Sequence, residues 1–137
     1  MLDEYRQLYE QEASKIKDWK KINKNTLCNL YVDEKSPALK NAYFSAIVAN
    51  YWYLIVSNYN TSKSIATQED VYDWLLESIL YALKHVSWRN PKSSIYQDPN
   101  GPDKVINRCM KCRRLTYYQQ MNRMKRKDGF GTLVVFR

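Results

Sequence analysis

The residues of this chain with the clearest chemical potential form one strongly basic segment near the carboxyl end. Between positions 104 and 127 there are nine basic side chains and no carboxylate: Lys104, Arg108, Lys111, Arg113, Arg114, Arg123, Lys125, Arg126 and Lys127. The first 103 residues nearly balance, with 12 basic against 13 acidic side chains. The formal charge of +8 is therefore a local field. Such a field favours a polyanion such as nucleic acid.

Aromatic rings lie within this basic segment. Tyr117 borders two arginines, and Tyr118 falls outside the apolar stripe of the segment. Cations hold phosphates without distinguishing sequence, and flat rings stack on unpaired bases of any kind. The combination favours single-stranded or partly opened DNA over an intact duplex groove. In the alternative interpretation, the rings belong to the core and the charges form an ordinary solvated face.

A second set of charges is acidic and lies earlier in the chain. Glu69, Asp73 and Glu77 recur at every fourth position, so they share one face of a predicted helix, beside Leu76 and Leu80. Carboxylates at this spacing could bind a metal ion, but interleaved leucines are more typical of a protein-docking surface. An ordinary solvated face is the alternative.

Catalytic and metal-binding patterns are weak. Cys109 and Cys112 form one CxxC pair, and Cys28 and His85 are the only other thiol and imidazole. A zinc site needs four ligands, and this pair falls within a helical pattern, so we expect small packing residues and no metal. His85 near a helix end suggests a structural role. Phosphate-binding glycine motifs are absent, and we predict neither a cofactor nor an enzyme.

Composition indicates one all-α domain of 137 residues. Three glycines and four prolines are too few for the turns of a β fold, and three cysteines do not form a disulfide framework. The acidic amino terminus is unlike a secretory signal, and the most apolar stretch, 42–56, is too short and polar to span a bilayer. We expect a cytoplasmic protein without a membrane partner.

The periodicity predicts four helices in a bundle-like arrangement. The first covers about 2–21 and is followed by a polar loop over 22–36. Ser36 and Pro37 begin an apolar helix reaching about 57, and a third helix runs from Thr67 to about 86. The basic helix covers about 104–127 after a proline-containing loop, with a buried stripe of Ile106, Met110, Tyr117, Met121 and Met124. Residues 128–137 form an irregular or β-prone tail.

The order of these elements resembles region 2 of bacterial sigma factors. An apolar helix over 41–58 precedes the stretch Glu69-Asp70-Val71-Tyr72-Asp73-Trp74-Leu75-Leu76-Glu77, a loop and the basic aromatic helix, so the resemblance covers about 40–127. It implies contact with the clamp coiled coil of the largest RNA polymerase subunit by Asp70, Asp73, Leu76, Glu77 and Leu80. It also implies capture of the melted promoter −10 strand by Lys104, Arg108, Lys111, Arg113, Arg114, Tyr117, Tyr118, Arg123, Lys125 and Arg126.

The chain departs from the family at the start of the basic helix, where Asp103-Lys104-Val105 replaces the usual aromatic opening. It also has no room for the helix-turn-helix of longer members. In this respect it is similar to the short late sigma factors of tailed phages, which act with co-activator proteins in a bacterial host. Two other classes stay open. One is a small helical component of a phage particle or other assembly, with a DNA-facing basic helix. The other is an enzyme acting on nucleic acid.

Overall fold

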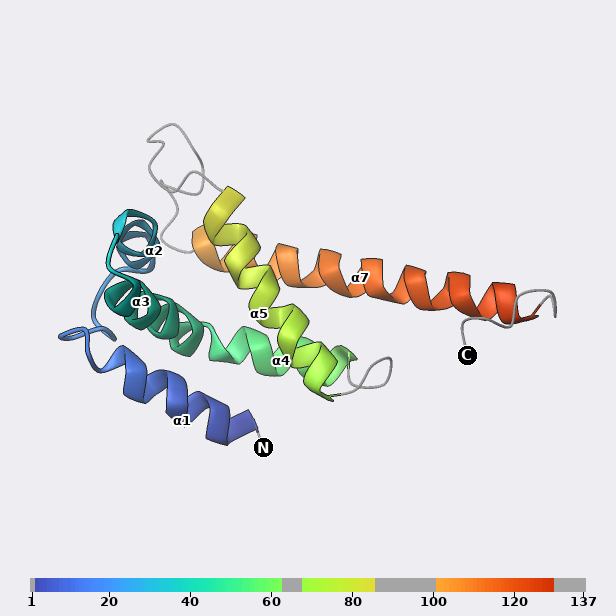
Figure 1. Ribbon diagram of the computed structural model, residues 1–137, viewed down its shortest axis with the longest axis horizontal. Coiled ribbons are helices and arrows are strands. Elements are labelled where there is room, and N and C mark those ends of the chain that lie inside the picture. The colour runs from blue at the N-terminus through green and yellow to red at the C-terminus, as the bar shows by residue number, and fades with distance from the viewer. Residues whose placement is uncertain (1, 63–67, 86–100, 130–137) are drawn as a thin grey trace.

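The computed structural model describes residues 2–62, 68–85 and 101–129, apart from the side chains of Ser62, Gln68, Tyr117, Tyr118 and 121–129. The described residues form six helices and no strand, namely α1 (Leu2–Ala13), α2 (Lys24–Asp33), α3 (Pro37–Asn50), α4 (Trp52–Ser62), α5 (Gln68–His85) and α7 (Gly101–Gly129), as shown in Figure 1. The all-α class is confirmed, whereas the prediction of four helices is not.

The predicted helix over 38–57 is in fact two helices, and their break lies at Tyr51. Ser36 and Pro37 begin α3 as expected. At Tyr51 the backbone leaves the helical region (φ −102°, ψ 18°), although its N–H still bonds to the Ile47 carbonyl at 3.0 Å. The bend lets one apolar stretch serve two sets of partners, because α3 packs on α1 and α2 while α4 packs on α5 and α7.

The prediction of a loop over 22–36 is also wrong, since most of these residues form α2. Asn23 caps this helix, and its side-chain oxygen accepts hydrogen bonds from the backbone N–H of Asn25 (2.9 Å) and Thr26 (3.4 Å). Polar residues that favour turns are also the residues that favour helix caps, so the pattern was ambiguous. Leu27 and Cys28 then bury the helix against the core.

The first helix ends earlier than predicted, at Ala13 and not near 21. Residues 14–22 form a series of turns between α1 and α2. Within them Asp18 has a positive φ of 55°, a conformation that a helix cannot include and that aspartate tolerates better than most residues.

One hydrophobic core joins all six described helices. On α5 the spacing predicts Val71, Leu75, Ile79, Ala82, Leu83 and Val86 as inward positions; the first five are buried, and Val86 lies outside the described residues. On α7 the two predicted positions with described side chains, Ile106 and Met110, are completely buried. The helical periodicity therefore identified the core faces of the helices it found.

Helix α7 is fixed to the rest of the protein by its amino-terminal part. It begins at Gly101 with buried Pro102 in its first turn, and it packs on α5, α4 and α2. The buried amide of Asn58 in α4 donates to the Asn107 side chain of α7 at 3.2 Å. The remainder of the helix extends beyond the other elements (Figure 1). The whole helix has 29 residues and spans about 43 Å.

Residues 130–137 of the predicted tail, and residues 86–100 before the basic helix, lie outside the described residues. Asp128 and Gly129, which we assigned to the tail, belong to the end of α7. Within the described part of the chain, none of the helices combines the length and the apolar character needed to cross a bilayer.

Candidate nucleic-acid interface

The predicted DNA-binding residues all belong to one helix, α7. Lys104, Arg108, Lys111 and Arg113 are exposed, and Arg114 is half-buried. Leu115 beside them is also exposed, at 56%. Tyr117, Tyr118, Arg123, Lys125 and Arg126 lie farther along the same helix, and their side chains are outside the described set. The described side chains thus form a cationic surface with one apolar group on it.

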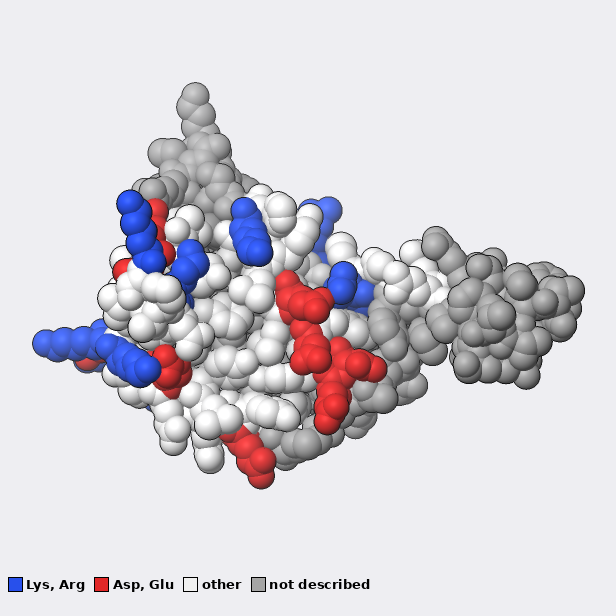
Figure 2. Space-filling model, in the orientation of Figure 1, with Lys and Arg blue, Asp and Glu red and all other residues white. Residues whose placement is uncertain are grey.

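The predicted polymerase-binding residues lie on α5 and divide into two kinds. Asp70, Asp73 and Glu77 are exposed, and Figure 2 shows carboxylates gathered along the outer face of α5. Leu76 and Leu80 are half-buried, and Leu76 packs against the core. The carboxylates are therefore more exposed to solvent than the leucines, which expose only part of their side chains.

The structure brings the two predicted surfaces together. Arg113 Nη2 of α7 donates to Glu77 Oε2 of α5 at 2.7 Å. A groove of about 470 Å³ runs beside this ion pair, between Ser78 and Tyr81 on one wall and Arg108, Cys109 and Cys112 on the other. A second hollow, of about 350 Å³, continues past the pair towards Asp70 and Asp73. Acidic residues of α5 and basic residues of α7 therefore line these two adjacent hollows, and the Glu77–Arg113 ion pair lies at the border of both.

The thiols do not form a metal site among the described residues. Cys28, Cys109 and Cys112 are free, and no cluster of three or more His, Cys, Asp or Glu side chains was found in that part of the chain. Burial is the main cause that raises the pKa of Cys109, and burial also raises that of Cys28 to about 12. The expectation that both members of the CxxC pair pack inside is wrong for Cys112, which is exposed on the groove wall.

His85 ends α5, as the sequence indicated, and its ring lies 4.3 Å from that of Tyr81. No base or nucleophile is placed against it among the interactions described for this residue. Its position in the last turn suits a structural role, because a helix carboxyl end favours positive charge.

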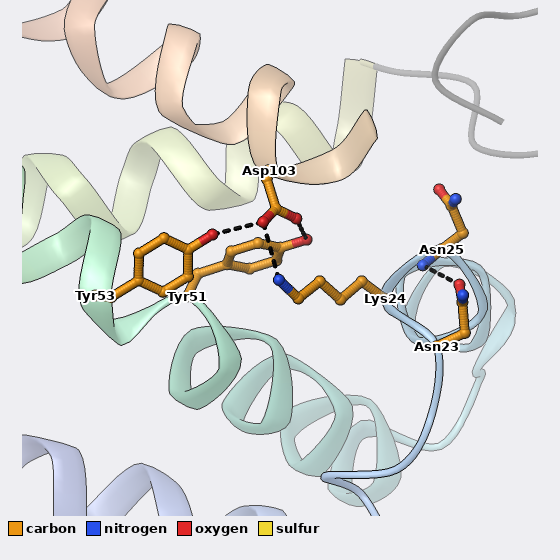
Figure 3. A network of polar contacts seen from close by, with 6 residues as sticks. All are labelled: Asn23, Lys24, Asn25, Tyr51, Tyr53 and Asp103. Carbon is orange, nitrogen blue, oxygen red and sulfur yellow. Dashed lines mark hydrogen bonds and ion pairs between the residues drawn. The ribbon is translucent and has the colours of Figure 1, made fainter. Parts of the chain in front are cut away.

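The sequence analysis missed a polar cluster at the start of α7, formed by Asp103, Lys24, Tyr51 and Tyr53 (Figure 3). Asp103 Oδ1 accepts a hydrogen bond from the Tyr51 hydroxyl at 2.9 Å. Asp103 Oδ2 accepts from the Tyr53 hydroxyl at 2.5 Å and from Lys24 Nζ at 2.9 Å. We call these four residues the Asp103 cluster. It ties α7 to α2 and to the break between α3 and α4.

The electrostatics of the Asp103 cluster favour a charged carboxylate. Burial alone would raise the pKa of Asp103, but hydrogen bonds from the two tyrosines and Lys24, together with the lysine charge, outweigh it and lower that pKa. Burial and the bond to Asp103 raise the pKa of Tyr53 to about 12. The Lys24 ammonium also lies 4.9 Å from the Tyr51 ring centre, within cation–π range.

One local signal pointed to this cluster. Asp103 is the last carboxylate before the basic segment, and an acid in the first turn of a helix interacts favourably with the helix dipole. Its partners are 50 to 79 residues away, so no local pattern could name them.

Comparisons with known proteins place the chain in no family: no family model matches it, and neither does any curated protein or solved structure. The resemblance to sigma factor region 2 therefore rests on the residues quoted above. The arrangement of α5 and α7 is the further ground for a functional proposal.

Proposed function

We propose that this chain is a sigma-like transcription initiation factor that binds core RNA polymerase through α5 and promoter DNA through α7. The observation that carries the proposal is the placement of an exposed acidic face beside an exposed basic face, joined at the Glu77–Arg113 pair. A factor that delivers DNA to a polymerase needs two such surfaces side by side. We propose a binding role for both and no catalysed reaction.

The α5 surface suits a basic protein partner. Asp70, Asp73 and Glu77 are exposed along one helix, and the outer edges of two leucines lie beside them. Opposite charge steers the encounter with such a partner, and the apolar edges add contact area once water is expelled. In this proposal the partner is the clamp coiled coil of the largest polymerase subunit.

The α7 surface suits nucleic acid. Lys104, Arg108 and Lys111 are exposed within two turns of helix, and they can neutralise successive phosphates. Arg113 adds a fourth charge. Its bond to Glu77 is solvent-exposed, and such pairs contribute only about 0–1 kcal/mol, so a phosphate can displace the carboxylate.

Co-purification with core polymerase tests the α5 assignment. The test variant is Asp70→Lys with Asp73→Lys, which reverses two exposed charges and leaves the half-buried Leu76 in place. The matched control is Asp3→Lys with Glu4→Lys, the same change on exposed carboxylates of α1. We expect the α5 variant to lose association and the control to keep it. Equal retention by both variants would exclude the α5 contact.

Salt-dependent DNA binding tests the α7 assignment. For Arg108→Gln with Lys111→Gln we expect weaker binding to all sequences, with the slope of log K against log salt reduced by about 0.7 per lost contact to a single strand. Tyr118→Leu should weaken binding to opened DNA by roughly 1–3 kcal/mol and leave closed duplex unchanged. Equal losses on both DNA forms would remove the stacking role.

Light scattering on the purified chain separates this proposal from the assembly component. A sigma-like subunit should be monomeric until polymerase is added, whereas a structural component should form a symmetric oligomer by itself.

A further inference from the structure

The segment between α1 and α2 is a second concentration of positive charge. Residues 14–22 contain four lysines and one carboxylate. Lys15 is paired with Glu12 at 2.9 Å, and Lys17, Lys20 and Lys21 are exposed. In Figure 2 basic side chains project at the left end of the molecule, over this connection. The segment is not part of α7 and was not among the predicted sites.

The shape of this segment is set by backbone hydrogen bonds between residues three positions apart. The N–H of Lys21 donates to the Asp18 carbonyl at 2.9 Å, and the N–H of Ile16 donates to the Ala13 carbonyl at 2.9 Å. The left-handed conformation of Asp18 turns the chain between them. The lysines are thus presented on a defined turn, and not on an extended strand.

A hollow of about 360 Å³ lies between this segment and α1, lined by Gln7, Glu10, Gln11, Ser14, Trp19 and Lys20. The half-buried Trp19 packs against the core and presents the rest of its ring to the hollow. The Lys20 ammonium lies over the Trp19 ring, 5.5 Å from its centre, so a base that stacks on this face has to displace it. The carboxylate of Glu10 is bonded to Arg6 at 2.9 Å, which offsets the one negative charge of the lining.

We infer that this hollow and its lysines form a second site for single-stranded nucleic acid, which holds one unpaired nucleotide. The base stacks on Trp19, because an indole face accepts any base. The amides of Gln7 and Gln11 each offer a donor and an acceptor to the base edge. Lys17, Lys20 and Lys21 hold the neighbouring phosphates. The site goes beyond the proposed function, because neither α5 nor α7 contributes to it.

Nucleic acid fits this site better than a membrane does. Binding to a lipid surface requires apolar side chains that project past the basic ones into the bilayer. Here Trp19 and Ile22 pack against the core of the protein, and Ile16 is half-buried. The surface therefore has charges at its rim and hydrogen-bonding groups in its hollow, as a nucleotide requires.

The experiment measures binding of the full chain to a fluorescent oligothymidylate. For Trp19→Leu we expect the Kd to rise about fivefold or more, and for Trp19→Phe, which keeps a flat ring, much less. Lys20→Gln with Lys21→Gln should reduce the salt slope by about 1.4. The matched control, Lys35→Gln with Lys84→Gln, removes the same charge from two other exposed lysines.

Ultraviolet crosslinking of the wild-type chain to the same strand, with peptide mapping, gives a second measurement that depends on no variant. We expect a crosslink at Trp19. A normal Kd for Trp19→Leu together with no crosslink in 14–22 would overturn the inference, as would equal losses in the control. Binding to phosphatidylserine vesicles that requires Lys20 and Lys21, with strand binding unchanged, would assign the surface to a membrane instead. Polymerase association tests α5 separately and is expected to survive all these changes.

Discussion

Two of the ion pairs described for helix α7 lie ten residues apart along it, and they differ in burial and in the number of hydrogen bonds to the carboxylate. In the first, Lys24 Nζ lies 2.9 Å from Asp103 Oδ2, and the side chains are 30% and 20% exposed. Two tyrosine hydroxyls also donate hydrogen bonds to this carboxylate. In the second, Arg113 Nη2 lies 2.7 Å from Glu77 Oε2, and the side chains are 54% and 58% exposed. The Glu77 carboxylate accepts no other hydrogen bond among those described. We therefore expect the shorter, exposed pair to be the easier one to break, because removing one partner of a part-buried, multiply bonded pair leaves the others without compensation.

The comparison separates two roles on one helix. The Asp103 cluster fixes the amino end of α7 against α2 and the α3–α4 break, so the helix leaves the core in a defined direction. The Glu77–Arg113 pair lies where the proposed polymerase and DNA surfaces meet, and it can open at little cost. Substitutions at the two pairs should therefore affect different properties of the protein.

The largest effect is expected from Asp103→Ala. This change leaves the buried Tyr51 hydroxyl and the Lys24 ammonium without their acceptor, and we expect a loss of roughly 2–4 kcal/mol in the free energy of unfolding. Urea denaturation followed by circular dichroism measures it. Asp103→Asn keeps one oxygen acceptor and should lose less. A loss below about 0.5 kcal/mol for Asp103→Ala would show that the cluster does not anchor α7.

A pH dependence is the next effect. The pKa of Asp103 is lower in the folded than in the unfolded state, where it is about 3.9. The stabilisation is therefore present above about pH 4 and is lost as the pH falls through the lower folded pKa. The difference in unfolding free energy between the wild type and Asp103→Asn should shrink over that range. A constant difference from neutral pH down to about pH 2 would contradict a charge-dependent cluster.

The two tyrosines sharpen the comparison within the cluster. Tyr51 is almost completely buried and Tyr53 is 52% exposed, although both donate to the same carboxylate. We expect Tyr51→Phe to cost about 1 kcal/mol and Tyr53→Phe about half of that, since water replaces an exposed donor. Thermal or urea unfolding measures the stability loss of both variants. A larger loss for Tyr53→Phe would show that the shorter hydrogen bond matters more than the more buried one.

The smallest effect on stability is expected from Glu77→Gln. The exposed pair should contribute about 0–1 kcal/mol to unfolding. Binding to single-stranded DNA should instead become a few-fold tighter, because Arg113 no longer competes with a carboxylate for phosphate. Fluorescence anisotropy and urea denaturation of the same preparation measure the two effects. A stability loss equal to that of Asp103→Ala would remove the contrast between the pairs.

Local periodicity predicted much of the fold and misjudged its connections. The inward face of α5 and the buried Ile106 and Met110 of α7 followed from spacing alone. Helix α2 was missed because its cap, Asn23, also favours turns, and the α3–α4 break was missed because the apolar stretch continues through Tyr51. In both places a local preference allowed two outcomes, and packing against other helices selected one.

The amino-acid sequence alone determined the helical class, the core faces and the separation of acidic from basic charge, since each depends on residues within a few turns of one another. Only the tertiary structure decided which charges meet. Asp103 is bonded to a lysine 79 residues away, and Arg113 to a glutamate 36 residues away. Pairings over such separations depend on how the helices pack, and many surface charges would serve equally well as partners until the packing selects one.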